Sequence, residues 1–382
     1  MSVSEMIQWI EGNEQEWVHL WGTLVNIDSG TYIKKGVDAV GGILRQELER
    51  MGFELMIHPQ EKFGDHLIAR KFGTGTKRIL LVGHMDTVFP DLEAVKRPFR
   101  IDGGRAYGPG VHDMKGGLVV MTAALQTLTV FGYQGYDTLT ILLNSDEEVG
   151  SPSSREIIEI EARKADAVFV FEPARTDRAL VTARKGVGMY HMAVTGRAAH
   201  AGADPQAGIS AVEELAHKTI ALHKLTNFDT GTTVNVGTVA GGTRSNVIAE
   251  SAKGDIDVRF FSREEAERVD KTIQEIANHS FLPGTTTVLT GGINRPAMEK
   301  NEGTIRLFEL VKKAGEELGI AVHDVASGGA SDGNFTSGVG AATIDSMGTA
   351  GGLAHGLSEY AEVDSLLEKI KLTALILMKA AE

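Results

Sequence analysis

The segment Ile79-Leu80-Leu81-Val82-Gly83-His84-Met85-Asp86-Thr87-Val88 decides how this chain folds. Four consecutive apolar residues bounded by Gly83 are typical of a short strand that is buried on both faces. His84 and Asp86 follow, and side chains two positions apart in an extended segment point to the same side. A carboxylate beside an imidazole can fix the tautomer whose other nitrogen binds a metal. Alone, this pair is more typical of a polar strand end, so its meaning depends on the rest of the chain.

Two other apolar runs end in acidic residues in the same way. Leu139–Leu143 is followed by Asn144-Ser145-Asp146-Glu147-Glu148, and Ala165–Phe171 runs into Glu172-Pro173. Strands that alternate with helices predict a mixed, mostly parallel α/β sheet. Ligands of such sheets bind at the carboxyl ends of the strands. The side chains that we expect at this edge are those of His84, Glu147, Glu148 and Glu172.

The pattern of elements changes near residue 184. Between residues 185 and 290 the sequence predicts strand, helix, strand, strand, helix and strand, which is the βαββαβ order of a ferredoxin-like sandwich. Helices at 302–319 and 361–380, with a strand at 341–346, then resume the first pattern. We therefore expect one discontinuous domain of residues 1–183 and 293–382, with residues 184–292 inserted as a second domain.

The first domain is expected to contain further elements. Helical spacing covers residues 4–25 and 37–51, and strands are expected at 53–57 and 66–71. Asp113 is placed to cap a helix over residues 114–130. Ser151-Pro152 has the cap-then-proline order of a helix start.

Composition excludes several classes of function. The 382 residues contain 38 Lys and Arg against 51 Asp and Glu, a net charge of −13, which disfavours nucleic acid and anionic membranes as partners. With no cysteine, any metal site must be built from His, Asp and Glu. The acidic N-terminus does not resemble a signal peptide, and no apolar run approaches the ~20 residues that span a bilayer. We expect a cytoplasmic protein.

Six acidic and histidine residues form the candidate site. Each has an ordinary explanation alone: an exposed helix start for Glu147 and Glu148, or a surface loop for His355. Their common position at strand ends and glycine-rich loops favours a metal site, and this set of imidazoles and carboxylates suits zinc. With one bridging carboxylate, two metals could polarise a carbonyl and lower the pKa of a bridging water, leaving one acidic residue as general base. The six are His84, Asp113, Glu147, Glu148, Glu172 and His355.

Five motifs, in this order, resemble those of the di-zinc amidohydrolase and exopeptidase family. That family includes carboxypeptidase G (glutamate carboxypeptidase), acetylornithine deacetylase, succinyl-diaminopimelate desuccinylase and aminoacylase. The resemblance covers essentially the whole chain, and it implies a zinc-dependent catalytic domain with an inserted lid and dimerisation domain. The motifs are Gly-His-Met-Asp at 83–86, Gly-Pro-Gly-x-x-Asp-Met-Lys-Gly-Gly at 108–117, Asp-Glu-Glu-x-Gly at 146–150, Phe-Glu-Pro at 171–173 and Ala-His-Gly at 354–356.

The resemblance also implies a role for each candidate. One zinc would be held by His84, Asp113 and Glu172, and the other by Asp113, Glu148 and His355, with Asp113 bridging. Glu147 would be the general acid and base, and Asp86 would orient His84. Cobalt or manganese could replace zinc. A cis peptide after Asp113 is also implied, whereas His112 and Asp65-His66 depart from the family pattern.

The inserted domain is expected to contribute to catalysis. By resemblance, His200 in Thr195–Gly202 acts in the active site of a partner subunit, so a homodimer is expected. Asn246 and Arg259 would together hold the free α-carboxylate of the substrate, although an ion pair of Arg259 with a nearby aspartate is the alternative. Ser327–Gly333 resembles a substrate-side glycine loop, with a plain flexible loop as the alternative.

These residues favour a metal-dependent hydrolase that cleaves an amide bond next to a free α-carboxylate, as a carboxypeptidase does. The substrate would be a small peptide or an N-acyl amino acid. An N-acyl-amino-acid deacylase or a dipeptidase is the alternative within the family. A dinucleotide-dependent enzyme is disfavoured because no strand is followed by G-x-G-x-x-G, and a non-catalytic relative is disfavoured by the presence of Glu147.

Overall fold

The computed structural model describes residues 2–382, which group into two compact units. Unit 1 contains the chain up to Thr182 together with Lys300–Ala326 and Ser331–Glu382. Unit 2 contains Ala183–Glu299 and Ser327–Ala330. The chain thus returns to unit 1 at Lys300 rather than at residue 293, because the last strand of unit 2 continues to Arg295.

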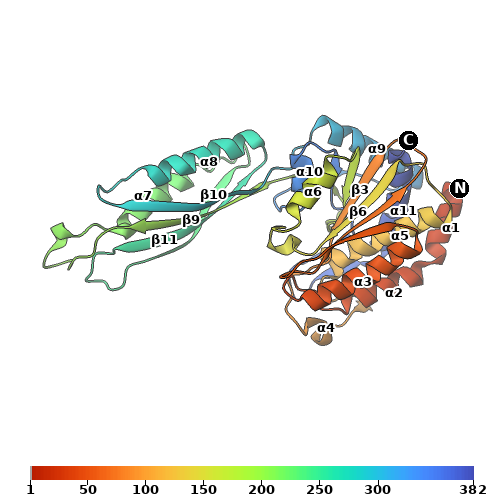
Figure 1. The fold of residues 1–382 in the computed structure, drawn as a ribbon, viewed down its shortest axis with the longest axis horizontal. Helices are drawn as coiled ribbons and strands as arrows, with labels where there is room; N and C mark the ends of the chain where they lie inside the picture. The colour runs from red at the N-terminus through yellow and green to blue at the C-terminus, as the bar shows by residue number, and fades with distance from the viewer. Residues whose placement is uncertain (1) are drawn as a thin grey trace. The chain divides into compact units, whose positions relative to one another are not determined.

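Unit 1 is built on a six-stranded mixed sheet with the order β1-β2-β6-β3-β7-β14 (Figure 1). The neighbours β6, β3, β7 and β14 run parallel, whereas β1 and β2 are antiparallel to their neighbours. The fold is therefore the mixed, mostly parallel α/β sheet that the sequence predicted. The strands are β1 (Glu54–His58), β2 (His66–Phe72), β3 (Arg78–His84), β6 (Thr138–Asn144), β7 (Ala167–Val170) and β14 (Thr343–Ile344).

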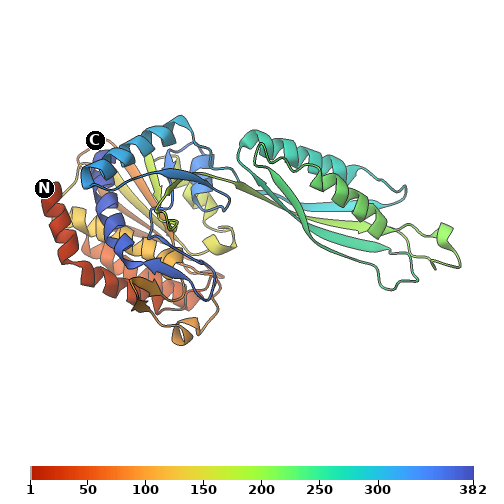
Figure 2. The same ribbon diagram turned by 180° about the vertical axis from the view of Figure 1, so that it is seen from behind.

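Helices cover both faces of this sheet (Figures 1 and 2). On one face Leu81 packs in the cluster that includes α3 (Lys34–Arg50), α5 (Gly116–Val130) and α11 (Val363–Ala380). On the other face its neighbour Val82 packs with α6 (Arg155–Ala162) and α10 (Gly333–Gly338). Successive residues of a strand point to opposite faces, so both must be apolar when both faces are covered.

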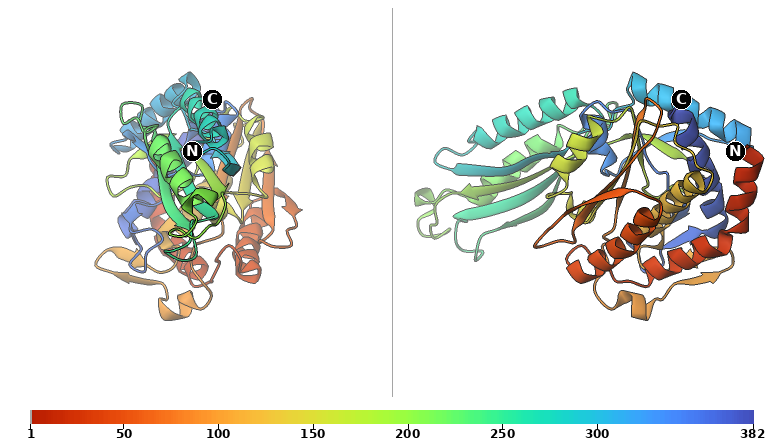
Figure 3. Two further views of the ribbon diagram at one scale, coloured as in Figure 1. Left: turned by 90° about the vertical axis from the view of Figure 1, so that its left-hand side faces the viewer. Right: turned by 45° about the vertical axis from the view of Figure 1, so that its right-hand side comes forward.

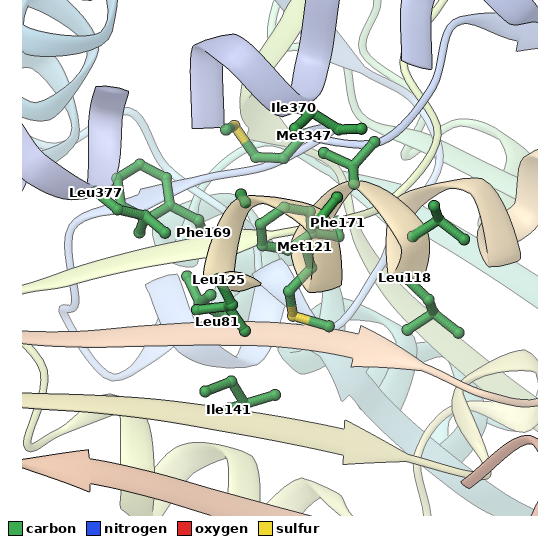
Figure 4. Packing of buried hydrophobic residues seen from close by; sticks show 14 of the residues in the cluster. Leu81, Leu118, Met121, Leu125, Ile141, Phe169, Phe171, Met347, Ile370 and Leu377 are labelled. Carbon is green, nitrogen blue, oxygen red and sulfur yellow. The ribbon is translucent and has the colours of Figure 1, made fainter. Parts of the chain in front are cut away.

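Helix α5 lies between the sheet and α11 (Figure 4). Leu118, Met121 and Leu125 of α5 are buried beside the strands, and Ile370 of α11 belongs to the same cluster. A helix that is apolar on all sides is stable only when it is enclosed in this way. Glycine permits its close contact with the sheet, because a Cβ at Gly117 would lie 1.9 Å from the Phe171 carbonyl oxygen.

Two predicted helix boundaries are wrong. The helical spacing of residues 4–25 belongs to two helices, α1 (Val3–Gly12) and α2 (Glu14–Val25), which are separated at Asn13. Asn13 has non-helical backbone angles, and its side-chain amide donates to the Trp9 carbonyl oxygen at 2.6 Å. Helix α6 begins at Arg155, not at Ser151-Pro152, because Ser151 has a positive φ of 56°.

A second, four-stranded sheet of unit 1 has the order β15-β16-β5-β4. Its strands β5 and β16 are antiparallel neighbours, with Tyr107 opposite Tyr360. This pairing brings the segment after Tyr107 close to the loop before Tyr360. The strands are β4 (Arg100–Asp102), β5 (Arg105–Tyr107), β15 (Gly351–Gly352) and β16 (Tyr360–Glu362). The other elements of unit 1 are α4 (Glu93–Lys96), η1 (Val111–Lys115), η2 (Glu147–Val149) and α9 (Glu302–Leu318). Two strands, β8 (Leu180–Arg184) and β13 (Asp324–Ser327), begin in unit 1 and end in unit 2.

Unit 2 is a ferredoxin-like sandwich, as predicted. Its antiparallel sheet has the order β10-β11-β9-β12, and both helices lie on one face of it (Figures 2 and 3). On β11 the buried Ile256 and Val258 alternate with Asp255 and Asp257, which lie on the face away from this core. The elements are β9 (Gly186–Thr195), η3 (Pro205–Ala207), α7 (Ala211–His223), β10 (Thr233–Gly241), β11 (Ser251–Phe260), α8 (Arg263–Asn278) and β12 (Thr286–Arg295).

Among residues 2–382, none of the helices combines the length and the apolar character that crossing a membrane requires.

Candidate metal centre

His84 is the last residue of β3, and its side chain is almost completely buried. The Nδ1 atom lies 3.0 Å from the backbone carbonyl oxygen of Asp86, so an Nδ1–H group can donate to it. This contact leaves Nε2 free for a metal, 3.2 Å from Oδ1 of Asp113 and 3.6 Å from Oε1 of Glu172. The strand end therefore aims a nitrogen ligand at two carboxylates.

Asp113 is not the helix cap that the sequence predicted. Helix α5 begins at Gly116, with Lys115 in the capping position, and Asp113 lies in the preceding turn η1. Its carboxylate is held by tertiary contacts, with Oδ1 3.2 Å from Nε2 of His84 and Oδ2 3.2 Å from Nε2 of His355. The Asp113–Met114 peptide bond is cis. Asp113 thus lies between two histidines from distant parts of the chain.

Two sets of possible metal ligands share Asp113. The first is His84, Asp113 and Glu172, and the second is Asp113, Glu148 and His355. Within each set the ligand atoms lie within 4.8 Å of one another. Nε2 of His355 is 3.2 Å from Oε2 of Glu148. The five metal-ligand candidates of the sequence are therefore brought together in one cluster of unit 1.

The charges in this cluster are poorly balanced without a cation. Burial raises the pKa of Glu172 well above its usual value, and the charges of Asp113 and Glu147 raise it further. Burial also raises the pKa of Glu148 to about 7. Oε1 of Glu148 is buried and has no hydrogen-bond partner among residues 2–382. Nitrogen and oxygen donors with an unpartnered buried oxygen fit a divalent cation, and they suit zinc, cobalt or manganese.

Glu147 lies outside both ligand sets, at the start of η2. Its side chain is largely buried, and its backbone N–H donates to Oδ1 of Asp86 at 3.2 Å. Oδ2 of Asp86 accepts from the Glu148 N–H at 3.3 Å and from the Thr31 hydroxyl at 2.7 Å. The Asp86 carboxylate therefore holds the Glu147–Glu148 backbone. It lies 3.5 Å from Nδ1 of His84, whose hydrogen bond goes to the carbonyl oxygen of Asp86.

Sequence reasoning missed Glu359. Its buried carboxylate accepts hydrogen bonds from the backbone N–H groups of Gly110, His112 and Asp113 at 2.8–3.1 Å. Burial raises the pKa of Glu359 to about 7. The sequence signal for it is weak, since only its place four residues after His355 connects it with the site.

His112 and His66, the two histidines that depart from the family pattern, lie near the centre but outside both ligand sets. Burial lowers the pKa of His112 to about 4, and a Cβ at Gly351 would lie 2.9 Å from its Nδ1 atom. Nε2 of His66 lies 2.9 Å from the Ser153 hydroxyl.

The flexible-loop alternative for Ser327–Gly333 does not hold for its second half, because Ser331 and Asp332 are buried.

His200 and Asn246 lie together in unit 2. The Ala201 N–H donates to the backbone carbonyl oxygen of Asn246 at 3.0 Å. Nδ1 of His200 accepts from the N–H groups of Gly202 and Ala203 at 3.2 and 3.0 Å. An Nδ1 acceptor places the ring proton on Nε2, so the exposed imidazole presents a donor.

Arg259 and Asn246, which are predicted to hold the substrate carboxylate together, lie far apart within one chain. Arg259 lies opposite Val187 at one end of β11, whereas Asn246 precedes Ser251 at the other end. The eight residue-to-residue steps from Ser251 to Arg259 span roughly 26 Å of extended chain. Arg259 instead makes two parallel hydrogen bonds to Asp257, with Nε–Oδ1 at 2.9 Å and Nη2–Oδ2 at 2.8 Å. The alternation of the strand predicted that Arg259 and Asp257 share one face. It could not show that Arg259 and Asn246 lie at opposite ends of the sheet.

Comparison with known proteins identifies the family of this chain. The model of peptidase family M20/M25/M40 matches residues 80–379. The chain belongs to this family. It is therefore a metallopeptidase-family enzyme with a metal-binding site, as the motifs indicated.

Curated relatives of this M20 enzyme include carboxypeptidases and deacylases. The chain is 33% identical to carboxypeptidase G2 of Pseudomonas sp. (strain RS-16), over 93% of this chain and 87% of that protein. It is 29% identical to acetylornithine deacetylase of Proteus mirabilis, over 58% of this chain and 60% of the relative.

Solved structures share the fold of this M20 enzyme. The aminopeptidase PepT of Bacillus cereus has a TM-score of 0.80 at 23% identity, covering 97% of this chain and 99% of that one. The YxeP protein of Bacillus subtilis, described as a dinuclear metal binding peptidase, has a TM-score of 0.70 at 16% identity, covering 97% and 98%. At these identities the likeness establishes the fold alone.

Proposed function

We propose that this M20 enzyme is a di-zinc hydrolase that cleaves an amide bond next to a free α-carboxylate, with carboxypeptidase-like specificity. The observation that carries the proposal is the pair of ligand sets that share Asp113 while Glu147 stays outside them. The similarity to carboxypeptidase G2 supports the choice of an exopeptidase that releases a C-terminal residue of the glutamate type. Its substrate is a small peptide or an N-acyl amino acid.

The residues of the centre divide into metal ligands and a proton carrier. His84 and Glu172 would hold one zinc, Glu148 and His355 the other, and Asp113 would contribute one oxygen to each. Two bound divalent ions supply polarisation of the scissile carbonyl and a lower pKa for a water molecule.

Glu147 accepts the proton of the attacking water and then donates it to the leaving amine. General acid and base catalysis requires a carboxylate that is close to the metal ligands without being one of them. The hydrogen bond from the Glu147 N–H to Asp86, the residue that also accepts from His84 through its carbonyl oxygen, fixes this position. Asp86 is thus proposed as a positioning residue for both ends of the site.

His200 is proposed to act in the active site of a second copy of the chain, with Asn246 beside it. The exposed Nε2–H of His200 suits the oxygen of a substrate carbonyl, which becomes more negative during attack. Unit 2 offers a surface for such a homodimer, because β10 is an edge strand with the exposed Val239, and Ile220 of the adjacent α7 is also exposed.

The dimer proposal can be tested by mixing two inactive proteins. His200→Ala should reduce turnover without changing the metal content. Mixed with the Glu147→Gln protein, it should regain activity, because a heterodimer contains one site with an intact Glu147 and an intact partner His200. Activity that does not return, when subunit exchange is shown by a tag on one chain, would count against action across subunits.

Arg259 is proposed to receive the free α-carboxylate of the substrate. A guanidinium offers a flat pair of donors that fits a carboxylate, and it already binds Asp257 in this manner. Substrate binding would exchange one carboxylate partner for another. Asn246 of the same chain is not available as a helper, since it lies at the other end of β11.

The second candidate function is deacylation of N-acyl amino acids, which the similarity to acetylornithine deacetylase favours. Both reactions would use the same metal ligands and Glu147, so the centre alone does not separate them. The test is a screen of the zinc-loaded protein against N-acyl glutamates, dipeptides, folate-like aroyl glutamates and N-acetyl ornithine. The proposal predicts the highest kcat/KM for an acyl or aroyl glutamate. A preference for N-acetyl ornithine would establish the deacylase instead.

A further inference from the structure

Glu359 connects the two loops that carry Asp113 and His355. Its Oε1 atom accepts from the backbone N–H groups of His112 and Asp113 at 2.8 and 2.9 Å. Its Oε2 atom accepts from the Gly110 N–H at 3.1 Å. The side chain is 1% exposed, and it belongs to neither ligand set. One carboxylate therefore satisfies three donors of the turn that presents Asp113.

The surrounding fold explains why these donors need Glu359. Strand β16 begins directly after Glu359 and pairs with β5, which ends just before the segment Gly108–Lys115. Gly110 has a left-handed φ of 71°, and a Cβ there would lie 2.6 Å from Cγ2 of Thr87. In this tight turn the three N–H groups point to the Glu359 carboxylate rather than into a regular helix. A buried N–H group without an acceptor is strongly unfavourable, so the turn depends on this side chain.

The two ligand sets differ in how firmly the backbone holds them. His84 ends β3, and Glu172 lies two residues after β7, so both are fixed by the central sheet. His355 lies in a loop, has a φ of 65°, and its side chain is 53% exposed. Glu359 follows in that same loop, where its own N–H donates to the Gly356 carbonyl oxygen at 3.1 Å. The Glu359 side chain therefore supports the second ligand set through Asp113, in a set whose histidine is held only by a loop.

We propose that Glu359 is a positioning residue that sets the geometry of the second metal subsite, formed by Asp113, Glu148 and His355. The inference rests on the proposed metal centre, and it adds the residue that keeps the loop-borne half of that centre in place. Removing a hydrogen-bonding group behind a metal ligand typically lowers metal affinity 10–100-fold. Because the first subsite retains its two strand-end ligands, we expect the loss to fall mainly on the second ion.

The test is zinc binding to the Glu359→Gln variant. Glutamine keeps one acceptor oxygen for the His112 and Asp113 N–H groups. Its NH₂ group faces the Gly110 N–H, so that N–H loses its acceptor. Titration with Zn²⁺ against a chelator should show a second ion bound roughly 10–100-fold more weakly, and a first ion changed less than about threefold. The matched control is Glu161→Gln, which removes another buried carboxylate of unit 1 that pairs with Arg70 and Lys164.

A second measurement needs no variant and no metal. Amide hydrogen exchange of the metal-free wild-type protein should show slow exchange at His112 and Asp113, because Glu359 already accepts both N–H groups. Fast exchange at both amides would overturn the proposal. So would equal weakening of both ions in Glu359→Gln, or no weakening of either. A wild-type protein that binds no second zinc would overturn the proposed metal centre, and this inference with it.

Discussion

Glu172 in unit 1 and Glu265 in unit 2 have opposite electrostatic surroundings, and their pKa values are shifted in opposite directions. In unit 1, Glu172 lies near Asp113 and Glu147, and burial together with their charges raises its pKa well above the usual value. In unit 2, Glu265 accepts from Arg268 at 2.7 Å and from the hydroxyl of Thr232, and these bonds lower its pKa to about 2. The carboxylates of the metal centre therefore lack a sufficient cation, whereas Glu265 of unit 2 already has one.

This difference separates a binding site from a stabilising contact. A charge that is paired within the chain contributes at most about 1 kcal/mol to stability, and it can bind a ligand only by giving up its partner. Clustered buried carboxylates are unfavourable alone and gain most when a divalent cation enters. The same residue type, glutamate, thus serves two purposes according to what lies beside it.

The largest effect is expected from removing the metal. A chelator should abolish hydrolysis, because the proposed reaction needs bound divalent ions to polarise the scissile carbonyl and to lower the pKa of the attacking water. Added Zn²⁺ should restore it, and the melting temperature should rise with the metal concentration by mass action. Amide exchange in α8 of unit 2 should not respond to either treatment. Full activity in protein shown by elemental analysis to contain no metal would remove the basis of the comparison.

The next largest effect is expected from Glu147→Gln. Glutamine cannot accept the proton of the attacking water, so kcat should fall about 10²–10⁴-fold. Both metals should remain bound, because Glu147 belongs to neither ligand set. The matched variant is Glu148→Gln, which should lose the second ion along with activity. If Glu147→Gln is the variant that loses metal, the roles of the two neighbours are reversed.

A moderate effect is expected from Arg259→Lys in unit 2. Lysine cannot form the parallel pair of hydrogen bonds, so kcat/KM should fall about tenfold for substrates with a free α-carboxylate. The C-terminal amides of the same substrates should be affected far less. The control is Arg268→Lys, which changes another paired arginine of unit 2 and should leave both substrates unaffected. Equal losses on acids and amides would make the Arg259–Asp257 pair purely structural.

The smallest effect concerns stability and its pH dependence. Glu265→Gln should lower the free energy of unfolding of unit 2 by about 1 kcal/mol at pH 7. The carboxylate has a pKa of about 2 in the folded state and 4.5 as its ordinary value, so its contribution is present above pH 4.5 and declines towards pH 2. Urea unfolding between pH 7 and pH 3 should show the difference from wild type shrinking. Glu275→Gln on the same helix is the control, and a difference that does not change with pH would contradict this account.

The sequence predicted the centre best where local structure decides the position of a residue. His84 and Glu172 follow buried apolar runs, and such runs end at one edge of a parallel sheet whatever the rest of the chain does. Asp113 was chosen as a ligand by resemblance, whereas its local pattern suggested a helix cap. Its carboxylate contacts two histidines that lie 29 and 242 positions away, and no local pattern encodes such contacts.

Two other features depend on tertiary structure in different ways. Glu359 binds only backbone N–H groups, which every residue but proline possesses, so no motif marks its partners. Alternation placed Arg259 and Asp257 on one face of β11, and the structure pairs them. The register of β9 and β11 shows that Arg259 and Asn246 are far apart. The alternation of side chains along a strand does not specify this register.

The most direct test of the central claim is a crystal structure of the zinc-soaked protein with anomalous data collected at the zinc absorption edge. The account predicts two anomalous peaks in unit 1 with Asp113 between them. One peak should contact His84 and Glu172, and the other Glu148 and His355. A single peak, or two peaks that do not share Asp113, would contradict it.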